Sequence, residues 1–261
     1  MTGAAAKSAS QGLLSQGDPA PVTVLNADST HPVLLVCEHA GRAIPQRLSG
    51  LGLGPGALDR HIGWDIGAAA VTALLAEMLG APAVLQNYSR LVVDCNRPPA
   101  AKDFIPEISD ETPVPGNFGL SDAARTARIA EIFDPFQAAV TQSLAHPARR
   151  AVFSIHSFTP VLAGVIRPWE ISFLYRGDPQ TPETLRKALL AQHPALNIGM
   201  NEPYQIEDAS DWFVPVHGEP SGLPHSLIEI RNDLIDGSDG QSGWADLLHD
   251  AIERFLEGIL S

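Results

Sequence analysis

The sequence predicts an α/β protein with a mixed, mostly parallel central sheet flanked by helices. Short continuous apolar runs indicate buried strands, and segments with apolar residues at helical spacing lie between several of them. The 22 glycines and 22 prolines divide the chain into short elements. Strands that alternate with helices in this way are typical of a parallel sheet.

Apolar runs predict the strands of this sheet. The first run follows Pro32 and ends in a polar cluster, as a buried parallel strand does. The predicted strands are 33–37, 83–85, 91–95, 151–155, 171–175 and 227–230.

Two helical segments follow the first strands. Apolar spacing predicts a helix over 65–79 that stops at Gly80, because glycine readily adopts the left-handed conformation of a helix C-terminus. Ser121 opens a second segment that runs to residue 144, and Pro135 is expected to kink or divide it.

Two further helices are predicted from their N-terminal residues. Thr181 followed by Pro182 is typical of an N-cap and a first helical turn. Ser242 is predicted to cap a closing amphipathic helix. We expect one domain over 21–261 behind a flexible leader, 1–20, which has no sustained apolar stretch of a signal peptide. The long Pro-rich loop 97–120 is a candidate lid.

The composition excludes several classes of protein. The chain of 261 residues has a net charge of −13, which disfavours binding to nucleic acid or to an anionic membrane. Its apolar stretches are shorter than the roughly 18 residues of a membrane span, so we expect a cytoplasmic protein. Cys37 and Cys95 are too few for a disulfide framework, and we expect buried thiols.

Residues with catalytic chemistry follow the predicted strands. In open α/β sheets, ligands bind beyond the carboxyl ends of the strands. Asp65 adds a carboxylate at the start of the first helix. The residues at the ends of the strands are Glu38, His39, Asn96, Arg97, His156, Glu229 and Arg231.

These residue types predict a catalytic zinc site. Two histidines and one carboxylate leave the fourth position of zinc open for a water, whose pKa the metal lowers toward ~7. His39, Asp65 and His156 supply such ligands, and Glu229 is suited to take the proton from the water. Other divalent metals could occupy the same ligands.

Each of these residues also has a structural interpretation. A histidine after a strand is often a hydrogen-bonding loop residue, and Asp65 could be only an N-cap. His61 is a rival ligand to Asp65. Glu229 in an apolar strand needs Arg231, a metal or a proton, because a buried unpaired carboxylate is costly.

Arginines near the ends of strands could bind an acidic substrate, because guanidinium groups bind carboxylates through two parallel hydrogen bonds. Arg90, Arg97 and Arg231 are the candidates, and pairing with Asp94 or Asp233 is the structural alternative. His217 and His225 precede the last strand. Either could polarise a carbonyl or an oxyanion, or be a surface histidine. The sequence has no Walker lysine and no GxSxG elbow, so nucleotide-driven and serine-hydrolase chemistry lack support.

Five segments together resemble the N-formylglutamate amidohydrolase family. They are VCEHAG at 36–41, DRHIGWDIGA at 59–68, SRLVVDCNRP at 89–98, SIHSF at 154–158 and IEIRNDLI at 228–235. The matches extend from about residue 31 to 255, nearly the whole chain.

The resemblance implies a zinc-dependent amidohydrolase with a fold similar to the zinc exopeptidases, of the phosphorylase/hydrolase-like type. It also implies the outline of the zinc-dependent cell-wall amidases, in which a histidine, an acid and a second histidine hold the metal. His39, Asp65 and His156 stand at those positions, and Glu229 stands at the late glutamate. If Asp65 is only a cap, Glu38 or His61 would complete the ligand set.

We therefore expect an enzyme that hydrolyses the amide of an N-formyl or small N-acyl amino acid, most closely N-formylglutamate. Zinc would be the cofactor, and a small acidic molecule the substrate. Glu229 and His217 are the candidate catalytic residues, and Arg90, Asn96, Arg97 and Arg231 the candidate substrate-binding residues. The alternatives are a peptide or cell-wall-type zinc amidase, and a binding protein without catalysis on the same fold.

Overall fold

A seven-stranded sheet forms the centre of the computed structural model, which describes residues 12–260. Its strand order is β1-β3-β2-β6-β11-β9-β10. Four of the six neighbouring pairs are parallel, and the pairs β1–β3 and β11–β9 are antiparallel. The predicted mixed, mostly parallel sheet is confirmed. The strands are β1 (Val22–Leu25), β2 (Val33–Cys37), β3 (Ala83–Gln86), β6 (Ala151–Phe158), β9 (Ile171–Leu174), β10 (Ile198–Met200) and β11 (His225–Arg231).

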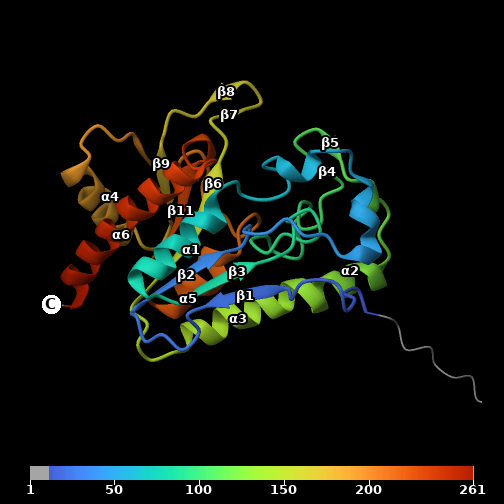
Figure 1. Cartoon of the computed structure of the whole chain (residues 1–261), viewed down its shortest axis with the longest axis horizontal. Helices are drawn as coiled ribbons and strands as arrows, with labels where there is room; N and C mark the ends of the chain where they lie inside the picture. Colours follow the sequence, from blue (N-terminus) through green and yellow to red (C-terminus); the bar gives the residue numbers. More distant parts are fainter. Residues whose placement is uncertain (1–11, 261) are drawn as a thin grey trace, which may run out of the picture.

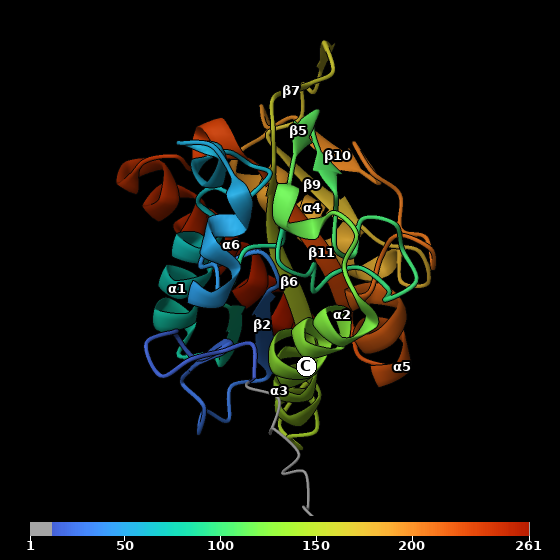
Figure 2. The same cartoon turned by 90° about the vertical axis from the view of Figure 1, so that its right-hand side faces the viewer.

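Helices cover both faces of the sheet (Figures 1 and 2). One face packs against α1 (Ala68–Leu79), α4 (Gln180–Gln192) and α6 (Ser238–Leu260), and the other packs against α3 (Asp134–Leu144). Successive residues of β2 alternate between the two cores, because side chains of a strand point to opposite faces. This two-sided burial explains the continuous apolar runs of the central strands.

The second helical segment is divided as Pro135 predicts. Ser121 caps α2 (Asp122–Arg128) by accepting a hydrogen bond from the Ala124 N–H (3.2 Å). A π-helical turn, Ile129–Phe133, then leads into α3. The remaining short helices are the 3-10 segments Gln46–Gly52, Ala57–Asp59, Pro115–Asn117 and Asn232–Leu234, the π segment Phe213–Gly218, and α5 (Glu219–Ser221).

The prediction of a strand at 91–95 is wrong. This apolar run forms turns, and its apolar side chains are buried in the core between the sheet and α3. Its carbonyl groups accept hydrogen bonds from side chains rather than from the backbone of a neighbouring strand. Asn117 Nδ2 donates to the Leu91 carbonyl (2.8 Å), and Arg128 Nη1 donates to the Val92 carbonyl (2.9 Å).

Several predicted boundaries also differ from the structure. The first helix begins at Ala68 rather than at residue 65, and β6 continues beyond residue 155 to Phe158. The closing helix begins at Ser238, one turn before the predicted cap Ser242. Thr181 lies inside α4, where its N–H donates to Asp178 (3.1 Å). Gly80 ends α1 in the left-handed conformation, as predicted.

Two small hairpins rise beyond the carboxyl ends of the central strands (Figure 1). The loop 97–120 contains the first, β4 (Ile108–Ser109) with β5 (Thr112–Pro113). The second, β7 (Val161–Leu162) with β8 (Val165–Ile166), follows β6.

The expected leader is only partly described. Residues 1–11 lie outside the described residues, whereas the Leu13 and Leu14 N–H groups donate to the carboxylate of Glu131 (2.5 and 2.9 Å). Both cysteines are buried free thiols, as expected. Within residues 12–260, no helix has the length and apolarity needed to cross a membrane.

Candidate active site

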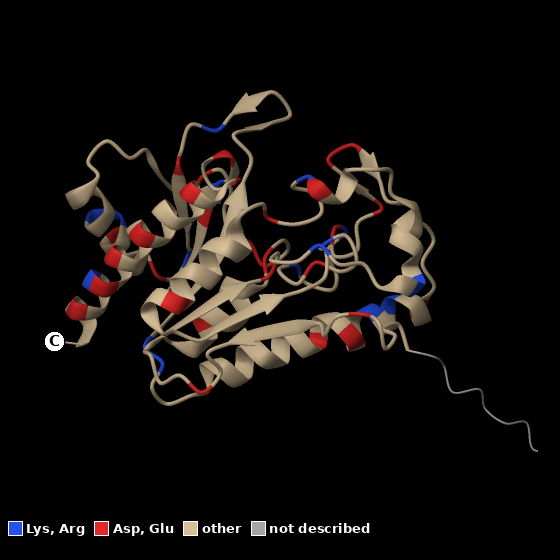
Figure 3. Ribbon diagram, in the orientation of Figure 1, with Lys and Arg blue, Asp and Glu red and all other residues tan. Residues whose placement is uncertain are grey.

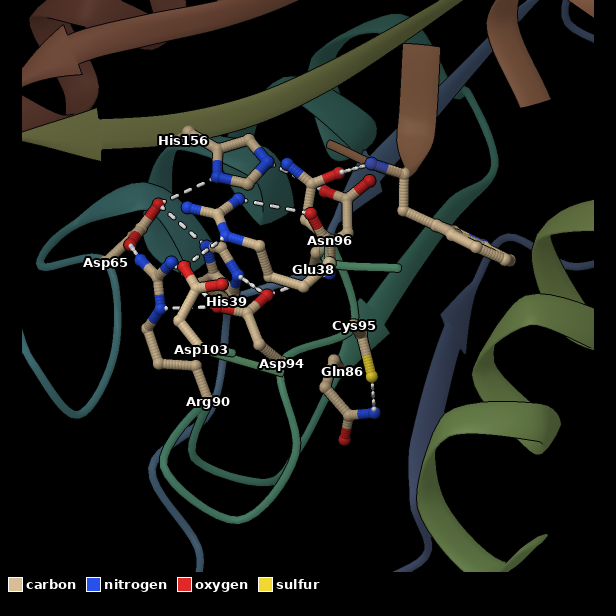
Figure 4. A network of polar contacts seen from close by, with 12 residues as sticks. Glu38, His39, Asp65, Gln86, Arg90, Asp94, Cys95, Asn96, Asp103 and His156 are labelled. Carbon is tan, nitrogen blue, oxygen red and sulfur yellow. Dashed lines mark hydrogen bonds and ion pairs between the residues drawn. The ribbon is translucent and has the colours of Figure 1, made fainter. Parts of the chain in front are cut away.

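His39, Asp65 and His156 converge in the interior, where His39 follows β2 and His156 lies near the carboxyl end of β6 (Figure 4). One ligand atom from each residue lies within 4.8 Å of the other two, and all three residues are buried. The Nδ1 atoms of His39 and His156 lie 3.4 and 2.9 Å from Asp65 Oδ2. Two imidazoles and one carboxylate in this arrangement suit a divalent cation such as zinc.

The topology accounts for this convergence. Strands β2 and β6 are parallel neighbours, so His39 and His156 meet at one edge of the sheet. The Asp65 N–H donates to the His39 carbonyl (3.0 Å), which closes the loop between them. Gly67 then begins α1 with a φ of +81°, and a Cβ there would lie 2.2 Å from the Ile235 carbonyl oxygen. Only glycine allows this approach.

A second carboxylate orients each histidine. The His39 Nε2–H donates to Asp94 (2.7 Å), and the His156 Nε2–H donates to Glu38 (2.9 Å). Ser154 donates a further hydrogen bond to Glu38 (2.5 Å). Both imidazoles thereby direct Nδ1 toward Asp65. Carboxylates in this position fix the tautomer of a ligand and increase its basicity.

The pKa values reflect this network of charges. Burial opposes ionisation of Asp94, but Arg90 and His39 outweigh it and hold its pKa well below the usual range. Burial likewise opposes protonation of His156, but hydrogen bonds to Asp65 and Glu38 raise its pKa well above the usual range. Figure 3 shows acidic and basic segments close together in the loops beyond the strands.

Glu229 differs from Asp94 in its hydrogen bonding and in the direction of its pKa shift. It is 7% exposed, and its Oε2 atom has no hydrogen-bond partner among the described residues. Burial and the charge of Asp65 raise the pKa of Glu229 to about 7, against the opposing effect of His156. A carboxylate with a pKa near neutrality can both accept and donate a proton.

One cavity of about 420 Å³ joins these groups, and we call it the inner cavity. It is lined by the three converging residues together with Arg90, Asn96, Arg97, Tyr204, Ser210, Asp211 and Glu229, among others.

The two arginines of the inner cavity differ in their pairing. Arg90 contacts two buried carboxylates, Asp94 (2.7 Å) and Asp65 (3.3 Å). Arg97 contacts Asp103 (2.8 Å), whose side chain is 57% exposed and competes with water for the bond. Asn96 is fixed by the Phe213 N–H, which donates to its side-chain oxygen (2.8 Å).

Other predicted residues do not line the inner cavity. His61 lies 3.6 Å from Asp110, and Glu38 hydrogen-bonds the nitrogen of His156 that faces away from Asp65. His217 contacts Gln137 (2.6 Å), and His225 contacts the Leu223 carbonyl (2.8 Å). Arg231 donates to its neighbour Asp233 (2.8 Å).

Sequence reasoning missed two residues. The sequence indicates Asp94 only as a partner of Arg90, although it also holds His39. Tyr204 lines the inner cavity from the segment after β10, a strand that the apolar runs of the sequence do not predict, so strand-end reasoning gives no signal for it.

Comparisons with known proteins agree with this architecture. A gene product of Agrobacterium tumefaciens shares 39% identity, with a TM-score of 0.88 over 95% of this chain and 100% of that chain. The N-formylglutamate amidohydrolase of Ralstonia eutropha shares the fold, with 16% identity and a TM-score of 0.64 over 92% of this chain and 98% of that chain. No curated protein sequence matches the chain significantly. The sequence model described as N-formylglutamate amidohydrolase matches residues 31–236, and the chain therefore belongs to that amidohydrolase family.

Proposed function

We propose that the protein is a zinc-dependent enzyme that hydrolyses the amide of an N-formyl or other small N-acyl amino acid. The first candidate substrate is a compound similar to N-formylglutamate. The observation that carries the proposal is the convergence of His39, Asp65 and His156 beside Glu229, a buried carboxylate without a partner for Oε2 among the described residues. Membership of an amidohydrolase family supports the type of reaction.

His39, Asp65 and His156 would hold the metal, because their donor atoms are close together and buried. A bound zinc ion would polarise the amide carbonyl and lower the pKa of a water toward ~7. Asp94 and Glu38 keep the two imidazoles oriented for this task.

Glu229 acts as the general base and then as the general acid. It takes a proton from the attacking water as the new C–O bond forms at the amide carbon. It then gives that proton to the amine nitrogen as the C–N bond breaks. The products are a carboxylate and a free amino acid. A pKa of about 7 suits both steps.

Arg97 binds the carboxylate of the substrate. The charge of Arg90 is matched by buried Asp94 and Asp65, whereas the partner of Arg97 is largely exposed. A substrate carboxylate can therefore replace Asp103 at low cost and form a charge-assisted hydrogen bond. Asn96 lines the same part of the cavity.

The loop 97–120 favours a small substrate. Arg97 at its start lines the inner cavity, and residues 108–110 line the neighbouring space above it. The two spaces, about 420 and 380 Å³, are of a size that holds a small molecule.

A metal-supplemented screen tests the proposal. Purified protein is dialysed against zinc, cobalt or manganese, and its metal content is measured. N-formyl, N-acetyl and N-succinyl amino acids are then assayed for release of free amine. We expect about one metal per chain and hydrolysis of at least one N-acyl amino acid. A metal-loaded protein that releases no amine from any of them would contradict the proposal.

A further inference from the structure

A second cavity of about 380 Å³ adjoins the inner cavity, and we call it the outer cavity. The two share Asp65, Arg90, Ser157 and Tyr204. A molecule bound beside Asp65 can therefore extend from one cavity into the other.

Apolar side chains form part of the wall of the outer cavity, beside carboxylates and other polar groups that form the rest. The two hairpins contribute Ile108 from β4 and Leu162 from β7, and Phe158 comes from the end of β6. Ile62, Leu91 and Pro106 complete the apolar lining. Residues 159–166, which include the β7–β8 hairpin, contain no charged residue (Figure 3).

Four carboxylates line the outer cavity, those of Asp65, Asp94, Asp103 and Asp110, whereas Arg90 is its lining arginine. Arg90 is matched by two buried carboxylates. Asp110 contacts Arg60 (2.7 Å), and Asp103 contacts Arg97 (2.8 Å). An anionic group in the outer cavity would meet carboxylates and no free cation among the described residues, so the lining favours a neutral group.

Ile108 of the first hairpin lines this space and is 61% exposed. A ligand that continues from the inner cavity would remove Ile108 and Leu162 from water.

We propose that the outer cavity binds the acyl group of the substrate, and that the preferred acyl group is neutral, apolar and several carbons long. This inference rests on the proposed function. With the substrate carboxylate on Arg97, the amino-acid half stays in the inner cavity, and the acyl half extends past Asp65 between the two hairpins. Hydrolysis then releases an apolar carboxylic acid and an amino acid.

A series of N-acylglutamates tests the assignment. We expect kcat/KM for N-hexanoylglutamate to exceed that for N-acetylglutamate by about tenfold or more, because methylene groups leave water in the outer cavity. N-succinylglutamate should be no better than N-acetylglutamate, since its second carboxylate would meet Asp103 and Asp110. Leu162→Asp should remove the advantage of the hexanoyl group.

Val165→Asp is the matched control, because Val165 belongs to the same hairpin but does not line the outer cavity. This substitution should change kcat/KM for neither N-hexanoylglutamate nor N-acetylglutamate. Equal kcat/KM for the hexanoyl and acetyl compounds would overturn the inference, and so would a preference that follows the amino-acid side chain.

Binding separates this inference from the proposed function. Calorimetry with Glu229→Gln should show N-hexanoylglutamate binding about tenfold more tightly than N-acetylglutamate, and Leu162→Asp in that background should abolish the difference. This result would support the acyl site even if the wild-type protein hydrolysed none of the compounds, which would defeat the proposed function alone. Equal affinities would overturn the acyl site whatever the turnover.

Discussion

Glu229 and His156 are paired in register on the neighbouring parallel strands β11 and β6. Paired residues of adjacent strands direct their side chains to the same face of a sheet. Both side chains accordingly line the inner cavity, and His156 also contacts Asp65 (2.9 Å). The sheet itself thus holds the proposed base beside the proposed metal ligands, without relying on a mobile loop.

Glu229→Gln should retain the metal and lose turnover by about 10²- to 10⁴-fold, the range that general-base catalysis contributes. Glutamine keeps the size of the side chain but cannot accept the proton. Metal content and amine release measured on the same sample check this. Glu257→Gln, at an exposed position of α6, is the control. If Glu229→Gln stays active, the base lies elsewhere.

The same substitution should change how the stability of the metal-free protein depends on pH. The pKa of Glu229 is about 7 in the folded protein and near 4.5 when unfolded, so the folded state holds its proton over that interval. Its contribution to stability is present below pH 4.5 and is lost as the pH rises to 7. Urea unfolding should show that the free energy of unfolding of Glu229→Gln rises relative to that of the wild type between pH 5 and 8. The gain should be at most about 3 kcal/mol. A constant difference would show that the pKa is not raised.

Glu38→Gln should weaken metal binding by about ten- to a hundredfold, because the partner of a ligand histidine fixes its orientation and basicity. The substitution removes the charge beside His156 Nε2 but none of the three proposed ligands. A competitive zinc titration measures the affinity. Asp103→Asn removes an exposed carboxylate that pairs with Arg97 and with none of the three proposed ligands, and it should leave metal affinity unchanged. Unchanged affinity in Glu38→Gln would argue that His156 does not bind the metal.

Arg97→Ala should raise KM by about tenfold or more, since a hydrogen bond to a charged group contributes about 1.5–3 kcal/mol. Arg231→Ala provides the comparison, because Arg231 contacts Asp233 and lies outside the inner cavity. Steady-state kinetics on one substrate should separate the two variants. A larger KM effect at Arg231 would place the substrate carboxylate elsewhere.

Gly67→Ala should destabilise the protein by more than Gly80→Ala does. Both glycines have a positive φ, which costs about 1 kcal/mol for alanine. A Cβ at Gly67 would also collide with the Ile235 carbonyl, whereas nothing lies within 4 Å of a Cβ at Gly80. Thermal unfolding measures the stability of both variants. Because Asp65 lies two residues before Gly67, metal affinity should fall only in Gly67→Ala.

The sequence alone determined the class of fold and the neighbourhood of the site. Continuous apolar runs mark strands buried on both faces, and the carboxyl ends of parallel strands meet at one edge. His39 and His156 could therefore be placed together from the chain alone, and the structure brings both to Asp65. This inference needs only local pattern and the direction of the strands.

The tertiary structure decided the partners of each side chain. The run 91–95 has the apolar composition of a strand, yet Asn117 and Arg128 satisfy its carbonyls from distant parts of the chain. Asp94 faces His39 rather than only its neighbour Arg90, and Arg231 pairs with Asp233 rather than lining the inner cavity. A sequence pattern records the burial of a segment. Which donor meets which acceptor depends on contacts between residues far apart in the chain, and these exist only once the chain has folded.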